Sequence, residues 1–154
     1  MSPDPAAARP DLPDRVAHSW DELHEVVAAL DDPQLAAPGP DGWSVKDHLV
    51  HLARWEEYLL ARLDGRDGIA EWGLDPSREW DADSVNAVLQ PRDAGVSPAA
   101  ARARLAGTHA RVLERLRTLD QADLERQLPL IEGNTCGHYD EHREWIRALA
   151  TAVG

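Results

Sequence analysis

The sequence predicts an all-α protein, and two observations carry this prediction. No segment alternates apolar and polar residues over six positions, which is the pattern of a half-buried strand. Several segments instead repeat apolar residues at spacings of three and four, as a helix with one buried face does. The chain has 154 residues, 43% hydrophobic and 29% charged, so we expect one globular domain with a substantial core.

Two parts are expected along the chain. Residues 1–12 are expected to be a flexible arm, because this stretch holds three prolines and no apolar run. Residues 13–152 are expected to form a single domain. Its first helix is predicted over 13–30, where Val16, Leu23 and Val27 recur at helical spacing, and it is expected to stop at residues 31–33.

Two further helices have clear start signals. Ser44 is a good N-cap with Asp47 three residues later, so a second helix is predicted from there to residues 64–65. Ser97 followed by Pro98 predicts the start of a third helix, which runs to about residue 119.

A fourth helix is predicted to begin near Asn134 or Thr135 and to run to about 152, with Trp145, Ile146 and Leu149 facing inward. A loop containing a short helix over 81–89 is expected between the second and third helices. Four helices of this length predict a four-helix bundle, and the long 64–96 link is expected to allow a crossover or to cover a pocket.

The charge balance excludes several partners. The formal net charge of −12 repels nucleic-acid phosphates and anionic lipids, so neither stable nucleic-acid binding nor a membrane partner is expected.

No apolar run approaches the roughly 18 residues of a membrane span. The start lacks the features of a secretory signal, and the single Cys136 cannot form an internal disulfide, which favours the cytoplasm.

His138 and His142 are the strongest chemical signal in the chain. They lie four residues apart on the fourth predicted helix, so their rings share one face, and Trp145 and Leu149 continue that face. Helices that donate two imidazoles to a metal use this spacing. His138 also lies in the first helical turn, where the helix dipole favours the neutral ring. The alternative is a pair of ordinary structural histidines.

A third ligand is expected from a facing helix. His51 is preferred over His48 and His109, because His51 shares a helix stripe with Trp55 and Tyr58. Three histidines with an open fourth position are typical of a catalytic metal, and zinc and nickel both accept imidazole. No other cofactor is expected.

Other residues have competing interpretations. Cys136 is either a buried small hydrophobe or a soft fourth ligand. Glu56, Glu141 and Glu144 are candidate general bases, of which Glu56 is preferred. The chain has six tryptophans and no phenylalanine, and each indole N–H needs a hydrogen-bond partner, which suits the edge of a ligand cavity. Trp55, Trp72 and Trp80 are the candidates to line such a cavity. Trp20 is expected in the core.

Two stretches carry a family resemblance. GWSVKDHLVHLARWEEYLLARL (42–63) contains W-S-V-K-D and H-L-x-x-W-E, and IEGNTCGHYDEHREWIRAL (131–149) contains G-N-T-x-x-H-Y-x-E-H. With these motifs residues 13–152 resemble the DinB/YfiT-like superfamily and, within it, the ClbS/DfsB four-helix bundle family. The resemblance implies a metal triad of His51, His138 and His142. Cys136 departs from the family motif, which usually has a larger residue there.

Three functions follow as hypotheses. The ClbS/DfsB resemblance implies self-resistance by hydrolytic opening of an electrophilic cyclopropane in a genotoxic compound. The substrate pocket is then expected to use Trp55, Trp80, Asn86, Asn134 and Tyr139. Glu56 or Tyr58 is expected to position the water if no metal is present.

The second hypothesis is a metal-assisted transferase or isomerase that uses a thiol such as mycothiol or bacillithiol, with Arg54, Arg62 or Arg143 at the pocket mouth. The third is a binding protein that sequesters a hydrophobic toxin without turnover. A small molecule is the expected partner in all three, and a homodimer is compatible with each of them.

Overall fold

The computed structural model describes residues 11–153, and in this range the chain is all-helical, which confirms the predicted class. The helices in chain order are α1 (Leu12–Ala28), α2 (Asp32–Ala36), α3 (Val45–Leu63), α4 (Gly68–Glu71), α5 (Ala82–Asp93), α6 (Pro98–Thr118), α7 (Gln121–Arg126), α8 (Leu128–Asn134) and α9 (Cys136–Val153).

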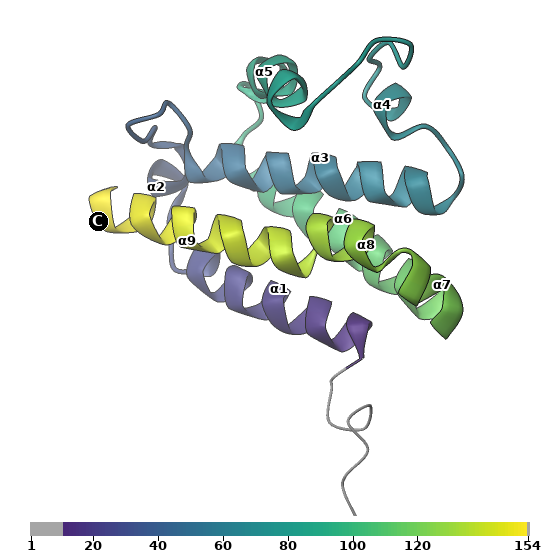
Figure 1. Cartoon of the computed structure of the whole chain (residues 1–154). Coiled ribbons are helices and arrows are strands. Elements are labelled where there is room, and N and C mark those ends of the chain that lie inside the picture. Colours follow the sequence, from purple (N-terminus) through teal and green to yellow (C-terminus); the bar gives the residue numbers. More distant parts are fainter. Residues whose placement is uncertain (1–10, 154) are drawn as a thin grey trace, which may run out of the picture.

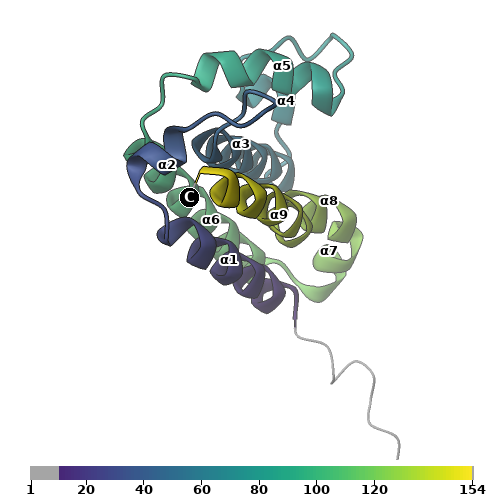
Figure 2. The same ribbon diagram turned by 90° about the vertical axis from the view of Figure 1, so that its left-hand side faces the viewer.

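The four longest helices, α1, α3, α6 and α9, pack around one hydrophobic core. Contacts link α3 to α6 and α9, and α1 to α6 and α9. Figures 1 and 2 show these four helices grouped together, with α4 and α5 on the outer side of α3, away from α1. Fully buried side chains from all four helices meet in the core, among them Val16, Leu52, Leu116 and Ile146. Burying such side chains is the main source of the stability of this fold.

The two predicted helix starts are found as expected. Ser44 caps α3 by accepting a hydrogen bond from the backbone N–H of Asp47, and the Asp47 carboxylate accepts one from the N–H of Ser44. Ser97 caps α6 directly before Pro98. The capped start of α3 sets the position of the two histidines that follow within its first two turns, His48 and His51.

Short helices replace several expected loops. The structure forms α2 at the predicted stop of the first helix, α4 in the expected 64–96 link ahead of the short helix, and α7 and α8 between the third and fourth predicted helices. Asp31, Asp67 and Asp120 start three of these helices, because each side chain accepts backbone N–H bonds of the first turn. Helix α5 continues to Asp93, four residues beyond the predicted end, with Pro91 inside its last turn.

An ion pair fastens α5 to α3. The Asp93 carboxylate accepts hydrogen bonds of 2.9 Å and 2.6 Å from the Arg54 guanidinium. Beneath α4 and α5 a second hydrophobic cluster forms around Trp72, Val85 and Leu89. These contacts hold α5 next to the middle of α3, where the candidate site lies.

The boundary of the expected N-terminal arm lies close to the start of α1. This helix begins at Leu12 with Asp11 as its N-cap, so Leu12, the last residue of the expected arm, is helical, whereas residues 1–10 lie outside the described residues. Within residues 11–153, no helix is both long and apolar enough to cross a bilayer.

Candidate metal centre

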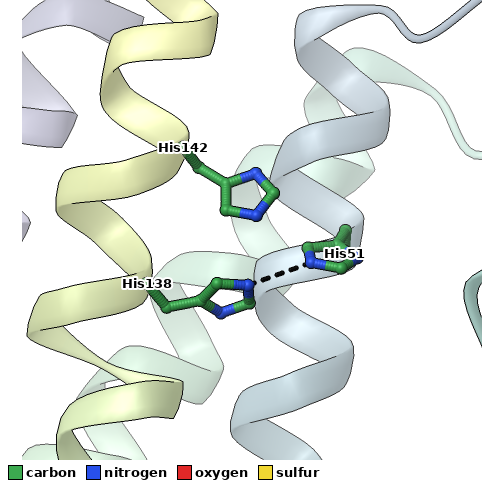
Figure 3. A group of neighbouring side chains, drawn as sticks. All are labelled: His51, His138 and His142. Atoms are coloured by element: carbon green, nitrogen blue, oxygen red, sulfur yellow. Dashed lines mark hydrogen bonds between the residues drawn. The ribbon is translucent and has the colours of Figure 1, made fainter. Parts of the chain in front are cut away.

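Three histidines meet between α3 and α9. His51 extends from α3, and His138 and His142 extend from successive turns of α9, so that the rings face one another across the two helices (Figure 3). One ring nitrogen from each lies within 4.8 Å of those of the other two. The Nε2 atoms of His51 and His138 are 3.0 Å apart. The sequence reasoning named these three residues, and the structure brings them together.

The helices explain this convergence. Residues four apart on a helix lie one above the other, which stacks His138 and His142 along the side of α9 that contacts α3. Helix α9 begins at Cys136, so His138 lies in its first turn. The positive end of the helix dipole there disfavours a protonated ring.

Burial keeps the three rings neutral. Desolvation, together with the neighbouring histidines, lowers the pKa of His51 to about 3 and that of His138 to about 4. The pKa of His142 is also lowered by burial and by the surrounding imidazoles. Neutral imidazoles offer free lone pairs, which is the form that binds a metal.

The group fits a divalent ion such as zinc or nickel. Three neutral imidazole nitrogens gathered at one point form a donor set that both ions accept. The other nitrogen of His138, Nδ1, is buried and has no hydrogen-bond partner among the described residues. The three histidines can therefore hold a metal ion.

A fourth histidine lies beside the group. The Nδ1 atoms of His48, on α3, and His142 are 2.8 Å apart, and the contact is buried. Burial lowers the pKa of His48 to about 4, so this ring is neutral as well. His48 does not belong to the group of three. His109, the other alternative ligand, lies elsewhere in the core, where its Nδ1 is 2.9 Å from the Tyr139 hydroxyl.

The histidines line a cavity of about 790 Å³ that is large enough for a small organic molecule. Three indoles, Trp43, Trp55 and Trp145, form part of its wall. Small apolar side chains of α5 and α9 add to this wall. The charged residues that line it are all acidic: Asp41, Asp83 and Glu141.

Three of the expected substrate-binding residues line this cavity. They are Trp55, Asn86 and Asn134. The indole N–H of Trp55 donates a 3.3 Å hydrogen bond to the Asn86 side-chain oxygen, which links α3 to α5. The Asn134 amide donates to the backbone oxygen of Leu130, which fixes it at the end of α8.

Trp80 and Tyr58, which were also expected at the site, lie outside the cavity wall. The Trp80 indole N–H donates to the backbone oxygen of Asp75 within the link. Tyr58 stacks on Trp72, with ring centroids 5.4 Å apart, and its hydroxyl accepts a hydrogen bond from Arg62. Neither side chain reaches the histidine group.

Glu56 and Tyr139 form a separate buried network. Both are fully buried, and the Tyr139 hydroxyl donates to the Glu56 carboxylate. Desolvation raises the pKa of Glu56 to about 8 and also raises the pKa of Tyr139. Neither residue lines the cavity, because their side chains face α6 and the Trp20 side of the core.

Trp145 differs from its expected place, whereas Cys136 takes the first of its two expected roles, that of a buried small hydrophobe. Trp145 is 48% exposed, so the expected inward position is wrong; its ring lies at the cavity rim beside His142. Ile146 and Leu149 are buried as expected. Cys136 is a buried free thiol that packs in the hydrophobic core and is not part of the histidine group.

Sequence reasoning missed several lining residues. Trp43 and Asp41 lie in the loop before α3, and Asp83 lies in the first turn of α5. His48 and Glu141 also line the cavity; the sequence offered both as candidates, but His51 and Glu56 were preferred to them. Their spacing of three residues from His51 and His138 places them on the same helix faces.

The expected cofactor-binding arginines are engaged elsewhere. Arg54 pairs with Asp93, Arg62 bonds Tyr58, and Arg143 pairs with Glu22. In residues 11–153 neither lysine nor arginine lines the cavity.

Comparison with known proteins gives one family match. The family model described as the DinB superfamily matches residues 15–151. Neither the curated proteins nor the solved structures contain a match.

Proposed function

The chain belongs to the DinB superfamily, and from this premise we propose that it is a metal-dependent hydrolase of an apolar, electrophilic small molecule. The observation that carries the proposal is the position of His51, His138 and His142 on the wall of a cavity that is rich in tryptophan. A ligand in this cavity lies against indole faces and within reach of the open side of the histidine group.

The finer assignment rests on the resemblance to the ClbS/DfsB family. We infer that α1, α3, α6 and α9 form the four-helix bundle of this type and that the segment with α4 and α5 is its long link. The activity that this resemblance implies is hydrolytic opening of a strained electrophilic ring, such as a cyclopropane, as self-protection against a genotoxic compound.

The cavity residues have distinct tasks in this proposal. Trp43, Trp55 and Trp145 bind the apolar body of the substrate by stacking. His51, His138 and His142 would hold a divalent ion, which would supply Lewis acidity and an activated water. Glu141, between the two histidines of α9 in sequence, is the carboxylate that lines the cavity there and is the proposed proton acceptor.

Two features disfavour a thiol cofactor that carries acidic groups. Low-molecular-weight thiol cofactors with acidic groups need basic partners, and the cavity wall instead carries Asp41, Asp83 and Glu141. The three candidate arginines are held in pairs outside it.

The test is turnover of neutral apolar electrophiles. Zinc- or nickel-loaded protein is incubated with styrene oxide and with p-nitrophenyl butyrate, with and without added thiol. We expect multiple turnovers without thiol, and their loss in the His138→Ala, His142→Ala double variant. The matched control removes two exposed histidines of α1, His18 and His24, and keeps the activity.

Other outcomes select the alternatives. An absolute requirement for thiol contradicts the hydrolase and favours the transferase. Binding of one molecule without product contradicts both enzymes and favours a sequestering protein.

A further inference from the structure

One hydrogen bond joins the Nδ1 atoms of His48 and His142, two neutral rings. Each neutral imidazole has one nitrogen that donates and one that accepts. The two Nδ1 atoms are 2.8 Å apart in a buried contact, so one of them carries hydrogen and the other accepts it. This rule leaves two arrangements, which differ in the ring that donates.

The metal site allows only one of these arrangements. If His48 donates, the proton of His142 resides on its Nε2, and a protonated nitrogen cannot bind a metal. If His142 donates through Nδ1, its Nε2 presents a lone pair. Figure 3 shows the two nitrogens of His142 on different sides of the ring, one directed toward the His51–His138 pair and one away from it.

We propose that His48 is a positioning residue: its Nδ1 accepts the Nδ1–H of His142 and holds that ring in the tautomer and orientation in which Nε2 faces the metal. This inference rests on the proposed metal site. Ligating histidines generally donate their second N–H to a nearby acceptor, which orients the ring and makes it a stronger ligand. Here the acceptor is another imidazole.

The surroundings of His48 support a fixed ring. His48 is only 5% exposed, and its ring packs against Trp43 and Trp145, with centroids at 5.2 Å and 6.1 Å. It precedes His51 by three residues on α3, so one rigid helix carries both a proposed ligand and the partner of another ligand.

The same geometry argues against His48 as a fourth ligand. Its Nδ1 points at the Nδ1 of His142 and not at the point where the other three rings meet. His48 therefore acts through His142.

The first experiment measures Co²⁺ affinity and the visible Co²⁺ absorption spectrum in wild type, His48→Leu and His48→Gln. The leucine removes the acceptor, whereas the glutamine amide oxygen can replace it. We expect a Kd that is about 10–100-fold higher for His48→Leu with an unchanged spectrum, and partial rescue by His48→Gln. His109→Leu, which removes an equally buried histidine outside the cavity, is the matched control and keeps the wild-type Kd.

The second experiment needs no metal. Correlation of ring protons with ring nitrogens by NMR in the metal-free protein reports each histidine tautomer. We expect hydrogen on Nδ1 of His142 and on Nε2 of His48, and the reverse pattern overturns the proposal. This readout remains available if His48→Leu does not fold.

The outcomes separate the two proposals. Wild-type protein that binds no Co²⁺ contradicts the metal site itself. Equal Kd values in wild type and His48→Leu contradict only the role of His48. A Co²⁺ spectrum showing one fewer imidazole ligand in His48→Leu than in wild type would make His48 a ligand and overturn its positioning role.

Discussion

At the scale of single residues, the most unusual side chain is Glu56. It is fully buried and accepts a hydrogen bond from Tyr139, whose hydroxyl also contacts His109, but its second carboxylate oxygen has no hydrogen-bond partner among the described residues. A charged carboxylate in such surroundings is costly, which is why burial raises its pKa to about 8. Glu56 is therefore mostly protonated at neutral pH.

This protonation makes stability depend on pH. In the unfolded chain Glu56 loses its proton near the ordinary value of about 4.5, whereas the folded protein keeps it to about pH 8. Folding thus binds a proton between these values, and the free energy of unfolding falls as pH rises, by up to about 1.4 kcal/mol per unit. We expect Glu56→Gln to remove this contribution, so that its stability relative to wild type grows from pH 5 to 8.

Urea unfolding at several pH values measures this difference. Parallel pH profiles for wild type and Glu56→Gln would show that the carboxyl is not protonated in the fold.

Trp145 provides a second test at this scale. It is 48% exposed at the cavity rim, so Trp145→Ala is expected to change the free energy of unfolding by less than about 0.5 kcal/mol. Loss of one aromatic contact is expected to weaken binding of the neutral fluorescent probe N-phenyl-1-naphthylamine by about tenfold. Trp72→Ala is the contrasting control, because Trp72 is buried in the second hydrophobic cluster.

Trp72→Ala is expected to cost about 3–5 kcal/mol of stability. Unchanged probe affinity in Trp145→Ala would contradict the assignment of the cavity as a ligand site.

The residue scale also shows what the sequence could predict. The i,i+4 spacing placed His138 and His142 on one face, and the stripe of His51 supplied the third ring. Tyr139 shows that neighbouring residues of one sequence motif do not all belong to the same site. It follows His138 directly, and successive helical residues point about 100° apart, so its side chain enters the core instead of the cavity.

At the scale of elements, long helices and caps were predictable, whereas short helices were not. The Ser44 capping box and the Ser97–Pro98 start are local signals that need no tertiary context. Helices such as α4 and α7 have four and six residues, which is too short for a periodic apolar pattern. Their Asp caps were the available signal.

The ion pair between α5 and α3 provides a test of what holds the cavity wall in place. Asp83 and Asn86 of α5 line the cavity, and the Arg54–Asp93 pair fastens the end of this helix to α3. Asp93→Ala removes both hydrogen bonds of the Arg54 guanidinium and leaves it only the 4.0 Å contact with Glu57, so we expect a loss of about 2 kcal/mol and faster amide hydrogen exchange throughout α5.

Asp64→Ala is the matched control, because Asp64 pairs with Arg115 at the surface, where ion pairs contribute about 0–1 kcal/mol. Equal exchange rates in α5 of Asp93→Ala and wild type would show that the ion pair does not hold this helix.

At the scale of the whole molecule, the site exists only in the folded chain. The cavity combines the loop before α3, one face of α3, the start of α5, the end of α8 and one side of α9. Local sequence patterns predict the long helices but not the side chains that converge from segments this far apart. For this reason Trp43 and Asp83 were missed, while the three histidines placed by helix periodicity lie together as predicted.

The overall charge agrees with the chemistry of the cavity. The net charge of −12 and the acidic wall residues Asp41, Asp83 and Glu141 repel anions and are compatible with a divalent cation at the three histidines. A bound ion stabilises the folded state by mass action, since the unfolded chain does not hold the three rings together.

The most direct measurement is the metal content of protein purified without a histidine tag. Elemental analysis should find near-stoichiometric zinc or nickel in wild type and in the His18→Ala, His24→Ala control. The His138→Ala, His142→Ala variant should contain none. Wild-type protein that holds no divalent ion, even after incubation with zinc and nickel salts, would contradict the metal centre on which the proposed function depends.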